Sequence, residues 1–169
     1  AEGIVPRDVI VADGNLIAGS RSYDMFAINA QTGAPAWRRY VWYSWIDSPP
    51  VFADGRIYSG TSDAVNVFAF DAATGARVWA APVPGWTWPR VAVGRRHVYA
   101  GVVGGEYSAP RAGGFASIDR ETGALRWLYE SERPESGLYG FAAAATTGRG
   151  RVYTADLTGR VYAFADPGG

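Results

Sequence analysis

Apolar residues fall in short runs along the whole chain, and glycine-containing turn signals separate many of these runs. Asp13-Gly14 and Asp54-Gly55 each lie between two such runs. Asp-Gly in this setting is typical of a tight β-hairpin, because glycine accepts a positive φ angle and aspartate bonds the amides of the turn. In the second region the pattern predicts strands over 50–53, 56–60, 66–70 and 77–82, each of about the usual length. The sequence therefore predicts an all-β protein.

A second turn signal recurs along the chain and ends in Thr-Gly, with a tryptophan at a constant offset on the strand that follows. Its three copies are Ala27–Gly33 with Trp37, Ala69–Gly75 with Trp79, and Ser117–Gly123 with Trp127. A fourth copy begins at Val161 and stops before its Thr-Gly. We expect Asn29, Asp71 and Asp119 to cap the turn amides, and Gly33, Gly75 and Gly123 to supply the left-handed residue. The repeat thus defines a unit of four short strands.

Such a unit of about 40 residues cannot bury both faces of its sheet alone, so the copies must pack against one another around an axis. This arrangement is a β-propeller. The three repeat tryptophans lie where a large ring would cover the join between neighbouring sheets. We expect a single propeller domain or half-propeller over 1–169, with blades at about 8–41, 49–83, 90–130 and 143–169.

The repeat Ala-hydrophobic-Asp-Ala-x-Thr-Gly-x-x-x-Trp resembles the tryptophan-docking motif of the PQQ-like (quinoprotein-type, BamB-like) β-propeller family. The resemblance covers almost the whole chain and implies the fold, whereas the motif is architectural and specifies no function. Members of this family usually have seven or eight blades, whereas this chain has four. The chain is then part of a larger ring, or pairs with a second copy, or closes alone; we favour the first two. The segment Gly3-Ile4-Val5 could add the missing outer strand to the fourth blade.

Composition narrows the class of partner. The 16 basic and 16 acidic residues give zero net charge, which argues against nucleic acid, because binding it requires a clustered positive surface. No stretch approaches the roughly 18–20 apolar residues that span a bilayer. From the family resemblance we expect a periplasmic or extracellular bacterial protein with a protein or peptide partner, which also forms a homodimer if two chains complete the ring.

The candidate binding residues are aromatic and arginine side chains in loops that a propeller places on one face. They are Trp42, Tyr43, Trp45, Trp86, Trp88, Tyr107, Arg111, Arg133 and Tyr139. Trp, Tyr and Arg dominate binding hot spots, and exposed loops on a rigid scaffold often carry function. The alternative is that the four loop tryptophans fold inward between the blades.

No catalytic constellation accompanies these loops. The chain has no cysteine and one histidine, His97, which we place in a solvated turn, so neither a zinc site nor a Ser-His-Asp triad is expected. We read Gly104-Gly105 as part of a flexible loop. The sequence favours a non-catalytic binding scaffold without cofactor. The alternatives are a carbohydrate-binding module and a fragment of a PQQ-dependent dehydrogenase, which would bind PQQ with calcium.

Overall fold

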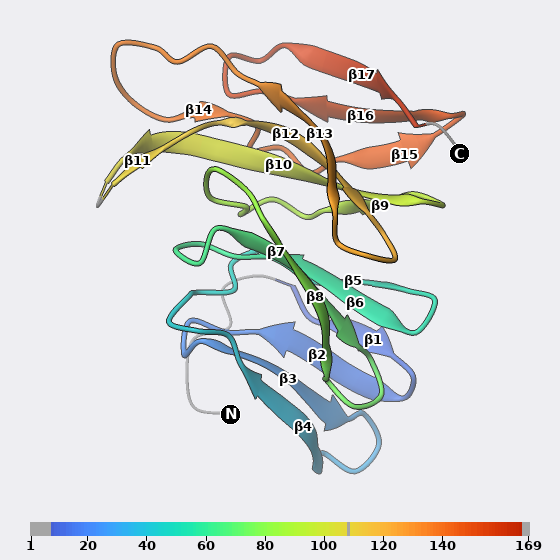
Figure 1. The fold of residues 1–169 in the computed structure, drawn as a ribbon. Helices are drawn as coiled ribbons and strands as arrows, with labels where there is room; N and C mark the ends of the chain where they lie inside the picture. Colours follow the sequence, from blue (N-terminus) through green and yellow to red (C-terminus); the bar gives the residue numbers. More distant parts are fainter. Residues whose placement is uncertain (1–7, 108, 167–169) are drawn as a thin grey trace.

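The computed structural model of the protein describes residues 8–107 and 109–166, and all of its regular structure is β. Four antiparallel sheets follow one another along the chain (Figure 1), which confirms the propeller architecture. The segment Gly3-Ile4-Val5 lies outside the described residues.

The first two sheets each have four strands in chain order. The first contains β1 (Ile10–Ala12), β2 (Asn15–Gly19), β3 (Asp24–Asn29) and β4 (Pro35–Tyr40). The second contains β5 (Val51–Ala53), β6 (Arg56–Gly60), β7 (Asn66–Asp71) and β8 (Arg77–Pro82). The strands predicted for the second repeat therefore agree with the structure to within one residue at each end.

The third and fourth sheets depart from this pattern. The third contains β9 (Ala92–Val93), β10 (His97–Glu106), β12 (Gly114–Asp119) and β13 (Leu125–Glu130), and the long β10 also pairs with β11 (Pro110–Arg111) and β14 (Tyr139–Gly140). The fourth contains β15 (Thr146–Gly148), β16 (Arg151–Ala155) and β17 (Val161–Ala165). Within the described part of the chain, the fourth sheet has no counterpart of β4, β8 and β13.

The hairpins and turns form as the sequence predicts. Asp13 and Gly14 have φ of 48° and 75°, and Asp54 and Gly55 have 48° and 74°, so both hairpins have two left-handed residues. In the Thr-Gly turns, the side-chain oxygen accepts the threonine amide and hydroxyl hydrogens, as at Asp71 with Thr74 (2.8 and 2.6 Å). These local bonds fix the turns that lead each chain segment into its outer strand.

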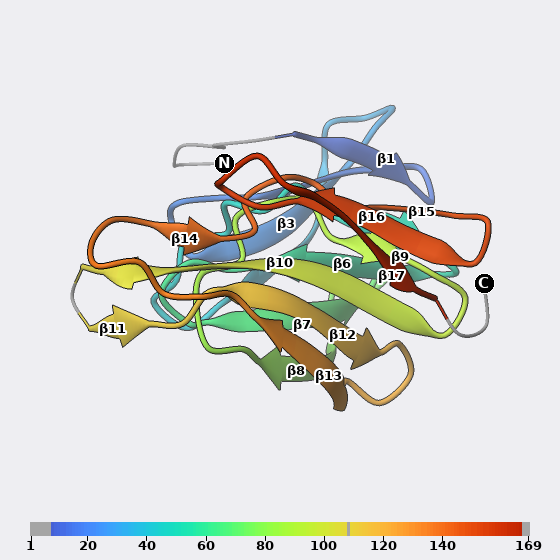
Figure 2. The ribbon, with the colours of Figure 1, turned by 90° about the horizontal axis from the view of Figure 1, so that it is seen from above.

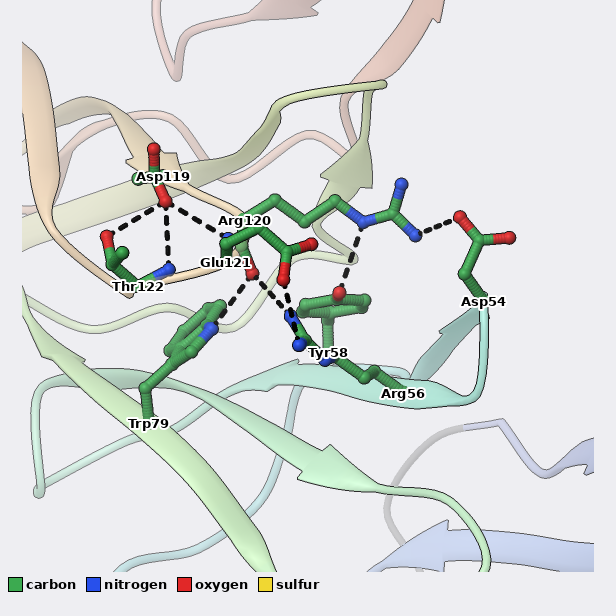
Figure 3. Close-up of polar contacts among 8 residues, drawn as sticks. All are labelled: Asp54, Arg56, Tyr58, Trp79, Asp119, Arg120, Glu121 and Thr122. Atoms are coloured by element: carbon green, nitrogen blue, oxygen red, sulfur yellow. Dashed lines mark hydrogen bonds and ion pairs between the residues drawn. The ribbon is translucent and has the colours of Figure 1, made fainter.

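Neighbouring sheets pack face to face. Trp37 of the first sheet donates from Nε1 to the carbonyl oxygen of Ala72 in the second (2.9 Å), and Trp79 donates in the same way to Arg120 in the third (3.0 Å). Figure 3 shows that Arg120 reaches back from the third sheet to the second, where its Nε donates to the Tyr58 hydroxyl (3.1 Å) and its guanidinium pairs with Asp54 (2.6 Å). Three apolar clusters between successive sheets form the core.

The four sheets do not close into a ring. Figure 1 shows the first sheet and the fourth at opposite ends of the stack. Both end faces expose apolar side chains, since Val11 is 69% and Val161 78% exposed. Closure of four blades on themselves, one of the alternatives from the sequence, is therefore wrong. The homodimer remains a prediction.

The acidic turn residues should make stability depend on pH. Arg126 and Thr122 lower the pKa of Asp119, and Thr74 lowers that of Asp71. Folding lowers both pKa values below the unfolded value of about 3.9. The two carboxylates therefore add to the free energy of unfolding above about pH 3.9, and this stabilisation is lost as the pH falls through the folded pKa. We expect the double variant Asp71→Asn, Asp119→Asn to lose less stability than wild type between pH 5 and pH 2, measured by urea unfolding.

The first blade shows that asparagine is compatible with this turn. The amide of Thr32 donates to the uncharged Asn29 side chain at Oδ1 (2.9 Å). Equal acid sensitivity of wild type and the double variant would show that the turns do not carry the effect.

Candidate functional site

The connections between blades lie together on one side of the molecule (Figure 1, left), which we call the loop face. It carries the β4–β5, β8–β9 and β13–β14 connections, and Figure 2 shows β11 at the same end of β10 as β14. The Asp-Gly hairpins and the Thr-Gly turns lie at the other end of the strands. This is the sorting of loops that the propeller architecture predicted.

Each inter-blade connection is anchored by one residue that packs on a glycine of an earlier strand, at the end of β2 and β6 and in the middle of β10. A Cβ added at Gly19 would lie 2.4 Å from Ile46, one at Gly60 would lie 2.3 Å from Thr87, and one at Gly101 would lie 2.6 Å from Phe141. Ile46, Thr87 and Phe141 are buried. The sequence analysis missed these anchors, although the glycine repeated at 19, 60 and 101 was their signal.

An exposed aromatic cluster lies on the loop face next to the first anchor. It consists of Tyr23, Tyr40, Trp42 and Tyr43, and the last three are 53%, 75% and 68% exposed. The rings touch one another, with centroids 5.8 Å apart for Tyr40 and Tyr43, 5.9 Å for Tyr23 and Tyr43, and 6.2 Å for Trp42 and Tyr43. The cluster thus presents joined aromatic surface to solvent.

The backbone under the cluster is held in an uncommon conformation. Tyr23 and Tyr43 have φ of 68° and 44°, in the left-handed region that bulky side chains seldom adopt. The amide of Val41 donates to the carbonyl oxygen of Tyr23 (2.6 Å), and the amide of Tyr43 donates to the Tyr40 hydroxyl (3.3 Å). Such residues cost of order 1–3 kcal/mol each, and they concentrate at functional sites.

Trp45 extends this surface. It is 40% exposed, and the guanidinium carbon of Arg21 lies 4.8 Å from its ring centroid. Asp47 fixes that arginine through Nε (3.0 Å). A guanidinium over an indole face is attracted to the ring, so the arginine orients the indole.

A groove of about 320 Å³ runs beside the cluster at the outer edge of the first two blades. Its lining includes Tyr40 and Trp42, together with Arg39 and Arg77. The groove therefore combines aromatic surface with two positive charges.

Trp86 and Trp88 do not belong to the exposed surface. Trp86 is 4% exposed, and its backbone exchanges two hydrogen bonds with Val103 (2.9 and 2.8 Å). Trp88 is half-buried, stacks on Trp86 with centroids 5.1 Å apart, and donates from Nε1 to Ser62 Oγ (3.3 Å). The burial of Trp86 agrees with the inward alternative, because Trp86 pairs with Val103 of the long strand β10.

The remaining candidates lie around the end of β10. Tyr107 is 90% exposed and Arg133 forms an ion pair with Glu106. Tyr139 is 8% exposed and donates its hydroxyl to the carbonyl oxygen of Arg111 (3.2 Å), and Arg111 is half-buried, so neither offers a free surface.

The structure contradicts the expectations for Gly104-Gly105 and for His97. Gly104-Gly105 is not a flexible loop, since both residues lie in β10 and pair with β14 and β11. His97 is not in a solvated turn, because it starts β10 and its side chain is only 13% exposed. Its Nδ1 lies 3.9 Å from Asp166 Oδ1.

Across 8–107 and 109–166, no group of three His, Cys, Asp or Glu side chains is placed to hold a metal ion. The described residues also include no helix long and apolar enough to cross a bilayer.

Residues 2–169 match the model of the family described as outer membrane protein assembly factor BamB. No curated protein sequence matches the chain.

Solved structures share its fold. BamB from Moraxella catarrhalis is 22% identical with a TM-score of 0.75, over 100% of this chain and 52% of that one. A europium-containing methanol dehydrogenase is 16% identical with a TM-score of 0.79, over 98% of this chain and 40% of that one. The computationally designed Ika4 protein is 15% identical with a TM-score of 0.69, over 98% and 92%. The chain thus spans about half of the BamB chain and less of the dehydrogenase.

Proposed function

The chain belongs to the family of the outer membrane protein assembly factor BamB, and on that premise we propose that it is a non-catalytic scaffold that binds a protein segment on its loop face. The proposal includes a periplasmic or extracellular location, which the family description favours. It includes no cofactor.

The observation that carries the proposal is the exposed aromatic cluster, Tyr23, Tyr40, Trp42 and Tyr43. A soluble domain gains nothing in stability from a tryptophan that is 75% exposed, and grouped apolar side chains on a surface mark interaction sites. Tryptophan and tyrosine also supply large contact area for little loss of conformational entropy. Because the strained backbone at Tyr23 and Tyr43 sets these rings in place, little ordering remains to be done on binding.

The adjoining groove indicates the chemistry of the bound segment. Arg39 and Arg77 line it beside Trp42. A segment that places an apolar or aromatic side chain on the cluster and an acidic side chain toward the arginines would match both features. We therefore expect bound peptides to pair an apolar residue with Asp or Glu.

Selection from a random peptide library displayed on phage tests the proposal. The wild-type protein should enrich peptides with the apolar-acidic pattern, and Trp42→Ala should weaken binding of the enriched peptides about 10–100-fold, as expected for a hot-spot residue. Titration of a synthetic enriched peptide, followed by fluorescence anisotropy, gives the two dissociation constants.

Leu125→Ala is the matched control, because Leu125 is 46% exposed at the opposite end of the strands, and it should leave the affinity unchanged. Three results would contradict the proposal. They are no enrichment over an unrelated protein, an equal loss of affinity in both variants, and, where no peptide binds, oligosaccharides that quench the tryptophan fluorescence of the wild type but not of Trp42→Ala. Dye-linked alcohol oxidation after addition of PQQ and calcium would contradict its non-catalytic part.

A further inference from the structure

The packing between successive sheets occurs three times and uses equivalent positions each time. In each sheet, one face points to the next sheet along the chain; we call it the leading face, and the opposite face the trailing face. The row Ile10, Ile17, Ala27 and Trp37 lies on the leading face of the first sheet, since these residues pair across β1–β4. It packs on the trailing row Phe52, Ile57 and Phe70 of the second sheet.

The other two junctions use equivalent positions. The leading row Val51, Tyr58, Ala69 and Trp79 packs on Val93, Val98 and Ile118. The leading residues Ala92, Tyr99 and Trp127 pack with Val152 and Phe164. Each blade in the middle of the stack thus has an apolar row on both faces, and a neighbouring blade buries each row.

Both ends of the stack leave such a face uncovered. The trailing row of the first sheet is Val11, Leu16 and Ile28, paired in the register of Phe52, Ile57 and Phe70. Val11 is 69% and Leu16 37% exposed, whereas the equivalent Ile57 is fully buried.

The leading row of the fourth sheet is Thr146, Tyr153 and Ala163, with Val161 beside it. Val161 is 78% exposed, whereas the equivalent Val67 in the second sheet is fully buried.

We propose that a second copy of this chain covers both end faces, so that the fourth sheet of each copy packs on the first sheet of the other. The junction would repeat the three that already exist within the chain. Two identical junctions related by a twofold axis close the assembly, which leaves no apolar end face in solvent.

The chemistry of the two end faces supports a second copy as the occupant, because they are the two sides of a junction that the chain already forms three times. The net charge is zero, so two copies do not repel one another as a whole. This proposal does not depend on peptide binding at the loop face.

One position at the new junction differs from its equivalents in a testable way. Tyr99 on the leading face of the third sheet donates to Asp166 of the fourth (2.5 Å), and Tyr58 is paired with Arg120. Tyr153 is the equivalent tyrosine of the fourth sheet, and the position equivalent to Asp166 in the first sheet is Ala30. Ala30→Asp should therefore give Tyr153 of the other copy a hydrogen-bond partner.

Sedimentation velocity of the intact chain tests the proposal. We expect the wild type at micromolar concentration to have twice the mass of one chain. Val11→Glu should reduce it to one chain while circular dichroism stays unchanged, because Val11 is exposed in the single copy. Val161→Glu, on the opposite end face, should do the same. Ala30→Asp should lower the dimer dissociation constant about tenfold.

Val78→Glu is the matched control, since Val78 is 43% exposed on β8 of the second sheet, away from both ends, and this variant should remain dimeric. A wild type that stays at the mass of one chain up to about 1 mM would overturn the proposal. A mass that increases steadily with concentration would also overturn it, because this indicates an open polymer. A dimer that persists in both Val11→Glu and Val161→Glu would overturn it as well.

Discussion

Replacing Trp79 with alanine is expected to lower the free energy of unfolding by about 3–5 kcal/mol, the usual cost of removing a buried aromatic side chain. The indole lies between the second and third sheets, is 7% exposed, and has its ring centroid 5.8 Å from that of Tyr58. Its Nε1 donates to the carbonyl oxygen of Arg120 (3.0 Å). The substitution therefore opens a cavity and removes a hydrogen bond at the same junction.

Urea unfolding followed by circular dichroism at one protein concentration measures this loss. Trp42→Ala is the comparison, because it removes the same side chain from a position that is 75% exposed and should change stability by no more than about 0.5 kcal/mol. Similar losses for the two variants would mean that the junction between sheets is not held by its tryptophan.

The strands and turns could be predicted from the sequence because their signals are local. Asp54-Gly55 specifies a hairpin through the φ angles of two adjacent residues, and Asp71 caps Thr74 three residues away. The packing of one blade on the next follows from the repeat, since a unit that recurs in the chain must meet its neighbour in a recurring way. These features depend on sequence separations of a few residues or of one repeat.

The exposure of the loop aromatics could not be predicted in this way. Trp45 and Trp86 occupy equivalent places, each directly before the residue that anchors its loop, Ile46 or Thr87. Trp45 is 40% exposed, whereas Trp86 is only 4% exposed. The reason is the length of the equivalent strand in the next blade: β10 runs to Glu106 and pairs with Trp86, whereas β6 ends at Gly60. The difference arises from an insertion in another blade.

The glycine of the Thr-Gly turn offers a second test of how blades join. A Cβ at Gly75 would lie 2.5 Å from Trp37 Cδ2 and Cε3, and the residue has a φ of 68°. Gly75→Ala therefore combines a left-handed alanine with overpacking against a buried ring, and we expect it to cost about 2–4 kcal/mol in urea unfolding.

Gly33→Ala separates the two causes. Gly33 has the same place in the first blade and a φ of 72°, but a Cβ there would meet no atom within 4 Å. This variant should lose only the backbone contribution, about 1 kcal/mol. The difference between the two alanines is then the cost of displacing Trp37 from the second blade. Equal losses would show that the turn conformation alone requires glycine, and that the tryptophan can move away from it without penalty.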